Sequence, residues 1–152
     1  MSSEKLVVRN RRATFDYHIE ERFEAGLVLT GSEVKSLRDG KASLAEAFVQ
    51  DDGGELYLVQ CHIAQYPFAN LLNHDPLRRR KLLLHAEEIR RIVRRITEKG
   101  YTAIAISIYF KNGKAKAEIG LARGKKQADK REDIKKRDAD REARRELRER
   151  NR

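Results

Sequence analysis

TAIAISIYFKNGKAKAEIGLA, residues 102–122, is the stretch that decides the fold. Residues 102–110 are rich in β-branched side chains and too short to cross a membrane, so they predict a strand. Asn112-Gly113 is a strong signal for a two-residue hairpin turn, because both residue types tolerate a positive φ. Residues 114–122 then return as the partner strand. The stretch therefore predicts an antiparallel hairpin.

Two segments nearer the N-terminus extend this β pattern. Asp51-Asp52-Gly53-Gly54 lies between two runs of strand-forming residues and predicts a second hairpin. Phe15, Tyr17 and Ile19 alternate with polar residues, and this period of two predicts a half-buried strand that starts at about Phe15. Ala25-Gly26 interrupts the pattern and predicts a bulge or a bend in that strand.

Two helices are predicted between the strands. Thr30 and Glu33 have the spacing of a capping box, so a short helix is expected over residues 31–39 with Gly40 at its end. Residues 86–99 carry an apolar stripe at helical spacing and arginines on the outer face. We interpret that arginine-rich face as a solvated one.

These elements together predict the fold class. The chain is expected to be mainly β with two or three helices, in an OB-like closed antiparallel β-barrel of about six strands. We place this barrel domain in residues 1–122. Residues 123–152 form the second part, a basic C-terminal tail.

The run GLARGKKQADKR, residues 120–131, marks the change from one part to the other. Its two glycines and its clustered cations predict a flexible, cationic hinge. The tail beyond it has little apolar content, so it is expected to be disordered when free. Acid-first pairs at i,i+4, such as Asp140 with Arg144, lower the cost of forming a helix against a partner.

Charge points to a polyanionic partner. The chain has 34 Lys+Arg against 24 Asp+Glu, a formal net charge of +10, and a pI near 9.9. A single cysteine excludes an internal disulfide and fits a reducing compartment. The chain shows no apolar run of membrane-spanning or secretory type, so a soluble, cytoplasmic protein is expected.

Two basic clusters are candidate phosphate contacts. Arg78 to Lys81 are four consecutive cations beside a leucine run, and such a cluster can neutralise several phosphates or form a solvated loop. Lys35 and Arg38 share one face of the first predicted helix, where they either meet a phosphate or solvate the helix. The four histidines lack zinc-finger spacing, so neither a metal nor a cofactor is expected.

Three separated motifs carry a resemblance to a known family. NRRATFDYHIEERFEAGLVLTGSEVKSLRDGKASL (residues 10–44), RKLLLH (80–85) and GLARGKKQADKREDIKKR (120–137) together resemble the SsrA-binding protein family, also called small protein B. The resemblance extends over essentially the whole chain, in the same order and spacing. It implies a bacterial partner of transfer-messenger RNA.

What the resemblance implies is a six-stranded OB-like barrel that binds the tRNA-like domain of transfer-messenger RNA. The protein would accompany this RNA to stalled 70S ribosomes for trans-translation, with its tail helical in the decoding centre and the empty mRNA channel. Elongation factor Tu is the implied companion within the complex, and the protein would be a monomer without catalytic activity.

The resemblance also assigns residues. Asn10, Glu24 and Leu83 correspond to the family's RNA-contacting positions. With the basic residues around them they give the predicted RNA-binding set: Asn10, Arg11, Arg12, Glu24, Lys35, Arg38, Arg80, Lys81, Leu83, Arg123, Lys125 and Lys126.

The predicted decoding-site residues of the tail are Asp129, Lys130 and Arg131. The sequence departs from the family at Ala128, where many relatives have histidine, and at Ala139, where some have a bulky aromatic residue. Stacking on a ribosomal base is therefore not available at these two positions.

Two other classes of function are compatible with a basic OB-like chain. A small nuclease would need a metal site or a positioned acid–base pair, and no two acids in the body form a recognisable ligand motif. A general single-strand binder would need several exposed aromatic residues, whereas most of the five Phe and five Tyr have the parity of core positions.

Overall fold

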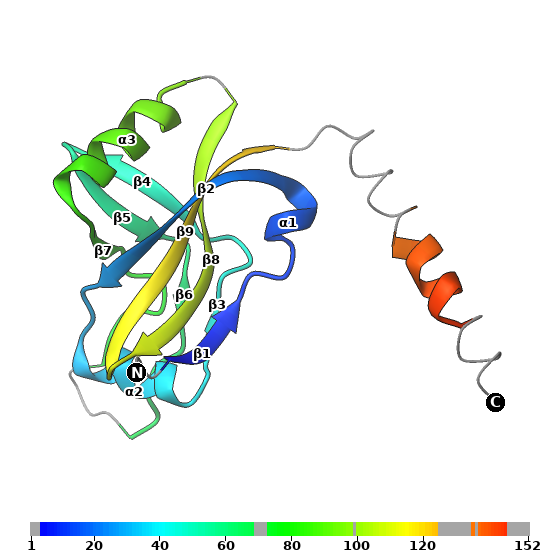
Figure 1. Cartoon of the computed structure of the whole chain (residues 1–152). Coiled ribbons are helices and arrows are strands. Elements are labelled where there is room, and N and C mark those ends of the chain that lie inside the picture. The colour runs from blue at the N-terminus through cyan, green and yellow to red at the C-terminus, as the bar shows by residue number, and fades with distance from the viewer. Residues whose placement is uncertain (1–3, 69–72, 99, 125–134, 136, 146–152) are drawn as a thin grey trace.

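The computed structural model describes residues 4–68, 73–98, 100–124, 135 and 137–145. Nine strands and three helices make up the body, and residues 137–145 form a further helix (Figure 1). In chain order the elements of the body are β1 (Glu4–Arg9), α1 (Ala13–Asp16), β2 (Tyr17–Leu27), α2 (Gly31–Arg38), β3 (Ala42–Ser43), β4 (Phe48–Asp52), β5 (Glu55–Val59), β6 (His62–Ile63), β7 (Arg80–Leu83), α3 (Ala86–Ile96), β8 (Tyr101–Lys111) and β9 (Lys114–Gly124).

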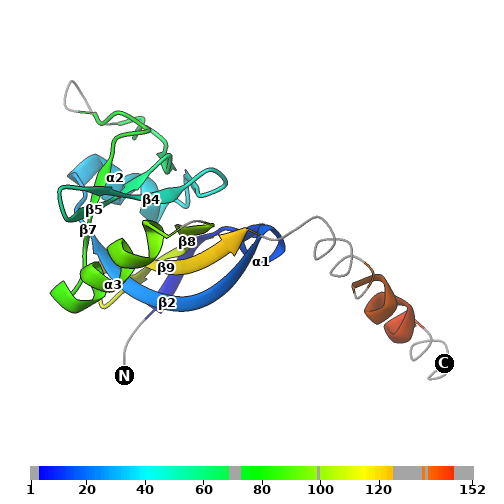
Figure 2. The ribbon, with the colours of Figure 1, turned by 90° about the horizontal axis from the view of Figure 1, so that it is seen from above.

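Six of the strands form a hydrogen-bonded ring in the order β8-β4-β5-β7-β2-β9, and β9 returns to pair with β8. All of these pairings are antiparallel. β1 pairs antiparallel with residues 107–111 of β8. β3 pairs with β6 in a separate two-stranded sheet. Figure 2 shows β4, β5 and β7 facing β2, β8 and β9 across the body. The prediction of a mainly β chain with about six principal strands and a few helices is confirmed.

The local turn and cap signals are confirmed. Gly53 and Gly54 have φ values of 63° and 87°, and Asn112 and Gly113 have 51° and 79°, as a two-residue type I′ hairpin turn requires. Thr30 and Glu33 form the predicted capping box at the start of α2, and Gly40 with φ 73° follows its end.

The first long strand begins later than predicted. Phe15 lies in α1, because the chain turns at Asn10 before the strand starts: the Ala13 N–H donates to the Asn10 carbonyl at 3.2 Å. The Asn10 side chain also accepts from the Arg12 N–H at 3.3 Å. These bonds favour one helical turn, so period two holds only from Tyr17 onward.

Of the two alternatives predicted at Ala25-Gly26, a bulge or a bend, the bulge is wrong. Both residues pair regularly with β9, and the register of β2 shifts instead between Ile19 and Glu21. Gly26 has a different purpose, because a Cβ there would lie 3.3 Å from the Cβ of Leu83 on β7. The glycine permits β7 to approach β2 closely.

The predicted hinge at residues 120–131 begins too early. Residues 120–124 belong to β9, which pairs with β2 as far as Gly124. A Cβ on Gly120 would lie only 2.8 Å from Cδ1 of Ile106, so this glycine serves tight packing between strands. Leu121 and Ala122 are buried. The folded body therefore continues through Gly124.

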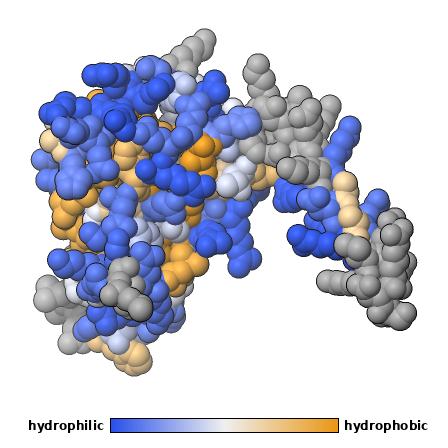
Figure 3. Space-filling model, viewed as in Figure 1, coloured by the Kyte–Doolittle hydropathy of each residue, from blue (hydrophilic) through white to orange (hydrophobic). Residues whose placement is uncertain are grey.

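The core fills the interior of the ring. It is built from inward-facing aliphatic residues of the strands together with Leu37 of α2 and Ile92 of α3, both fully buried. The face seen in Figure 3 is dominated by hydrophilic residues with smaller hydrophobic patches between them. Apolar side chains thus point into the ring and polar side chains point outward, as is typical of antiparallel sheets with one solvated face.

Candidate nucleic-acid interface

The basic run at residues 78–81 does not act as one cationic cluster. Arg80 begins β7 with its side chain turned inward, and none of it is exposed. Its Nε donates to the Glu33 carboxylate at 2.5 Å, and its remaining nitrogens donate to the carbonyls of Cys61 and Pro76. The predicted contact between Arg80 and RNA therefore needs correction, because a phosphate has no access to this guanidinium.

The other three cations of the run have acidic neighbours. Arg78 donates to Glu33 at 2.5 Å, Arg79 lies 3.2 Å from Asp52, and Lys81 lies 3.3 Å from Glu55. Except for Glu33, these partners are exposed, so the pairs are weak and can exchange for phosphate. Lys81 thus remains on the outer surface of β7.

A mixed surface surrounds Lys81, and we call Glu24, Val28, Lys81 and Leu83 the β2–β7 face. Leu83 is 53% exposed and packs over Gly26, two residues along β2 from Glu24. Val28 is 43% exposed, and its N–H donates to the Lys81 carbonyl at 3.1 Å. The face offers an acceptor, a cation and an apolar edge, which suits contact with bases and ribose hydroxyls.

Glu24 is held ionised by its neighbours on β8. Its carboxylate accepts the Tyr109 hydroxyl at 2.5 Å and the Lys111 ammonium at 3.4 Å. The hydrogen bond from Tyr109 and the charge of Lys111 outweigh burial and lower the pKa of Glu24 below its ordinary value. Burial and the same carboxylate raise the pKa of Tyr109, which stays a hydroxyl donor.

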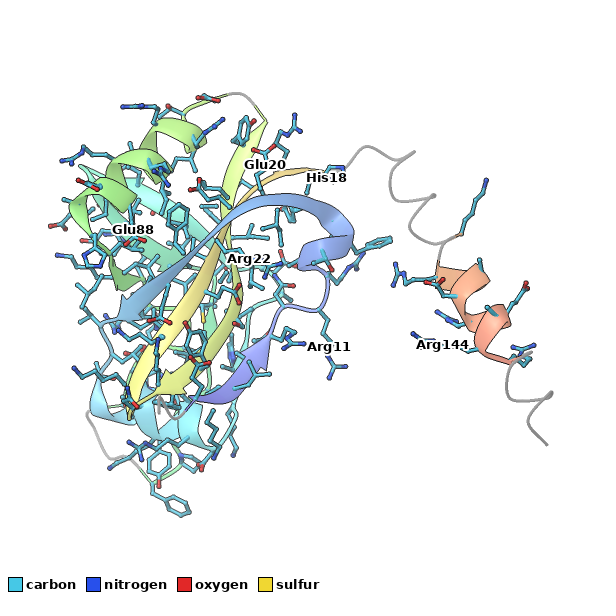
Figure 4. The ribbon with its side chains drawn as sticks, in the orientation of Figure 1. Arg11, His18, Glu20, Arg22, Glu88 and Arg144 are labelled. Carbon is cyan, nitrogen blue, oxygen red and sulfur yellow. The ribbon has the colours of Figure 1, made fainter. Side chains whose placement is uncertain are left out.

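A second group of predicted residues lies at the α1 end: Asn10, Arg11, Arg12 and Arg123. Asn10 is half-buried, and its side-chain amide donates to the carbonyls of Leu44 at 3.2 Å and Ala105 at 3.4 Å. Its amide therefore fixes the end of β1. Arg11 projects from the turn before α1, as Figure 4 shows.

Arg12 and Arg123 complete the α1 end. Arg12 lies 3.6 Å from Asp16, and its guanidinium carbon lies 5.8 Å from the Phe15 ring centroid. Arg123 lies 3.0 Å from Glu20, and its guanidinium carbon is 5.7 Å from the ring centroid of Tyr101. Both side chains are more than half exposed, so their charge is accessible to a phosphate backbone.

A third group lies on α2. The Lys35 ammonium is 5.5 Å from the Tyr66 ring centroid, and the Arg38 guanidinium carbon is 5.5 Å from that of Phe110. Both residues are exposed. The described RNA-binding predictions thus fall into the β2–β7 face, the α1 end and α2, with Arg80 removed to the core.

The remaining predictions concern the tail. Lys125, Lys126, Asp129, Lys130, Arg131 and Ala128 lie outside the described residues. Ala139 is exposed in the helix of residues 137–145, as is the pair Asp140 and Arg144.

The sequence did not reveal the residues that hold these surfaces in place. Tyr109 and Lys111 fix Glu24 from 85 and 87 residues away, and Arg91 of α3 lies 2.5 Å from Glu21 of β2. A local sequence pattern cannot identify hydrogen-bond partners that lie so far apart in the chain. The arginine face of α3, interpreted as solvated, therefore includes a contact to β2.

Among the described residues, no three His, Cys, Asp or Glu side chains gather where they could hold a metal ion. Cys61 is fully buried, and burial raises the pKa of its thiol to about 11. None of the described helices is long and apolar enough to cross a bilayer.

Known proteins are similar to this chain over nearly its full length. A family model described as SmpB protein matches residues 7–149. The SsrA-binding protein of Geobacter sulfurreducens is 56% identical over 146 residues, which are 96% of this chain and 95% of the relative. That of Halalkalibacterium halodurans is 50% identical over 148 residues, covering 97% and 96%.

The fold is also similar to a solved structure described as "tmRNA-SmpB: a journey to the center of the bacterial ribosome". The TM-score is 0.67 at 49% identity, and the match covers 79% of this chain and 85% of that chain. The likeness therefore extends to both sequence and three-dimensional structure.

Proposed function

The chain belongs to the SmpB protein family, and we propose that it binds the tRNA-like domain of transfer-messenger RNA and delivers this RNA to stalled ribosomes for trans-translation. The observation that carries the proposal is a match that includes the body and most of the tail. Trans-translation rescues the ribosome and tags the nascent peptide for degradation. In this scheme the protein is an RNA-binding adaptor and catalyses no step.

The ring of six strands supports an OB-like closed barrel as the RNA-binding body. The β2–β7 face and the α1 end provide the contacts to the tRNA-like domain. Both surfaces combine exposed cations with hydrogen-bonding or apolar side chains, as recognition of folded RNA requires. Arg80 has no part in this contact, because it is buried against Glu33.

The tail has the second task in the proposal. It lies as a helix in the decoding centre and the mRNA channel of the 70S ribosome, where Asp129, Lys130 and Arg131 meet ribosomal RNA. The acid-first pair Asp140 and Arg144, exposed on the helix of residues 137–145, supports this helical state. The protein acts as a monomer in the cytoplasm, together with elongation factor Tu.

Binding of labelled tRNA-like domain tests the proposal. We expect tight, saturable binding that weakens steeply with salt, by about 10³-fold between 50 and 200 mM if some six phosphates are neutralised. Controls are an elongator tRNA and an unstructured RNA of equal length, measured at the same salt concentrations. Equal affinity for all three RNAs would contradict a dedicated partner and would instead indicate a general RNA binder.

Leu83 provides a test of the β2–β7 face. Leu83→Ala is expected to weaken binding of the tRNA-like domain by about 5- to 10-fold, because an apolar edge against a base is lost. Phe48→Ala is the control: Phe48 is 41% exposed but lies on β4, which β5 separates from β7, so its replacement should leave affinity unchanged. Fluorescence anisotropy measures both, and wild-type affinity of Leu83→Ala would remove Leu83 from the interface.

A further inference from the structure

The partly buried Tyr66 and the exposed Phe68 form an aromatic pair beside α2. Phe68 is 82% exposed, more than any other large hydrophobic residue in the described part of the chain. Its ring meets that of Tyr66 edge to face, with centroids 5.6 Å apart and planes inclined by 70°. The Lys35 ammonium lies over the Tyr66 ring. A cation and two aromatic rings gathered at a surface are the groups that stack on the bases of single-stranded nucleic acid and neutralise its phosphates.

The backbone beneath the pair is held rigidly. The Asn73 side chain accepts from the Tyr66 N–H at 3.2 Å and donates to the Tyr66 carbonyl at 2.9 Å. Gln65 donates through its amide to the His74 carbonyl at 3.1 Å. The two chain segments are thus cross-linked through side-chain amides directly next to the aromatic pair.

His74 anchors this arrangement to the body. Its ring is 5% exposed, with Nδ1 2.8 Å from the Ser32 hydroxyl on α2 and Nε2 2.9 Å from the Ile63 carbonyl. Both ring nitrogens have partners, so the histidine is structural. The backbone of Tyr66 is thus bonded to Asn73, and the adjoining His74 is bonded to α2, which lowers the entropy cost of binding a ligand to the Tyr66 ring.

We infer that Lys35, Tyr66 and Phe68 form a stacking site for an unpaired base of the tRNA-like domain. This inference rests on the proposed function and adds to Lys35, already predicted to contact RNA, an aromatic contact that the sequence did not indicate. The exposed face of Phe68 would receive the base. Lys35 and the exposed Lys41, whose carbonyl accepts from the Ala64 N–H at 3.0 Å, are available to the adjoining phosphates.

The position of the site favours the tRNA-like domain over ribosomal RNA. Figure 1 shows α2 at one end of the body and α1 at the other, where β9 ends and the chain continues toward the tail. In the proposed function the tRNA-like domain contacts the β2–β7 face, and Glu33 of α2 is bonded to Arg78 and Arg80, which precede and begin β7. An RNA bound on that face can therefore extend onto α2, whereas the tail enters the ribosome from the opposite end of the body.

A tryptophan reporter tests the inference directly. The chain contains no Trp, so Phe68→Trp introduces a single indole at the site. Its fluorescence is expected to be quenched on addition of the tRNA-like domain, because a stacked base contacts the ring. Phe48→Trp on β4, where Phe48 is 41% exposed, is the matched control and should not be quenched. Quenching of Phe68→Trp by ribosomes but not by the tRNA-like domain would overturn the assignment.

Affinity measurements separate stacking from simple hydrophobic contact. Phe68→Leu should weaken binding of the tRNA-like domain at least about 5-fold, whereas Phe68→Tyr should keep nearly wild-type affinity. Normal binding by Phe68→Leu, or no quenching of Phe68→Trp while the RNA is bound, would overturn this inference and leave the proposed function intact. Failure of the wild-type protein to bind the RNA would refute the proposed function itself.

Discussion

Replacing Glu33 with alanine is expected to lower the free energy of unfolding by about 3–5 kcal/mol. The Glu33 side chain is fully buried, and its carboxylate accepts from Arg80, Arg78 and the Thr30 N–H at 2.5, 2.5 and 2.9 Å. Without it, the Arg80 guanidinium stays in the core with no opposite charge, and α2 loses its capping box. Both losses act in the same direction.

The matched control for Glu33 is an exposed glutamate with a similar partner. Glu55 lies 3.3 Å from Lys81, and both side chains are about half exposed. Glu55→Ala should therefore lower the free energy of unfolding far less than Glu33→Ala does. Urea unfolding of the two variants measures the difference. Equal losses would show that the buried pair contributes no more than a surface pair does.

The same cluster predicts how stability depends on pH. Burial alone would raise the pKa of Glu33, but hydrogen bonds from Arg78, the Thr30 N–H and Arg80 outweigh it and hold the pKa below its ordinary value of 4.5. The contribution to stability is therefore complete above about pH 4.5 and is lost as pH falls through the lowered pKa. The wild-type protein should lose stability faster in this range than Glu33→Ala does.

Glu33 also connects two of the surfaces proposed to bind RNA. It belongs to α2, which carries Lys35 and Arg38, and it binds the arginines that precede and begin β7, which carries Lys81 and Leu83. The buried ion pair thus fixes α2 relative to the β2–β7 face. A folded RNA that contacts both surfaces needs this spacing to be constant, because flexible placement would add an entropy cost to binding.

Local signals in the sequence predicted local structure well. The turns at residues 53–54 and 112–113 depend on two adjacent residues that accept positive φ, and the cap of α2 depends on Thr30 and Glu33 alone. Each of these turns and caps is determined by at most four consecutive residues. The strand pattern and the resulting ring of strands followed from such elements.

Features that depend on distant partners could not be predicted in this way. Arg80 is one of four consecutive cations, and only Glu33, 47 residues away, explains why this one turns inward. Gly120 has the appearance of a hinge residue until Ile106 and Ile19 are seen packed against it. Phe68 lies in a segment without a regular pattern, and its exposed ring stands beside a backbone that Asn73 holds through Tyr66, seven residues away.

Ending the chain after Gly124 is expected to abolish tagging on stalled ribosomes and to leave binding of the tRNA-like domain largely intact. The cut follows the last residue of β9, so every described strand and the packing of Leu121 and Ala122 are kept. Ending the chain after Ile119 would remove those buried residues, and we expect that product to unfold. Thermal unfolding of both products verifies that Gly124 is the boundary of the folded body.

The truncation removes both the net positive charge of the tail and its specific residues, and these two effects must be separated. Residues 125–152 carry 13 Lys+Arg and 8 Asp+Glu, so the truncation removes a net charge of +5 and should weaken non-specific binding to any RNA. The full-length double variant Lys130→Ala/Arg131→Ala removes only two charges. It should retain specific binding and lose most of the tagging measured in a reconstituted translation system. Normal tagging by this variant would show that the tail contributes bulk charge, whereas normal tagging by the truncated chain would refute the role of the tail altogether.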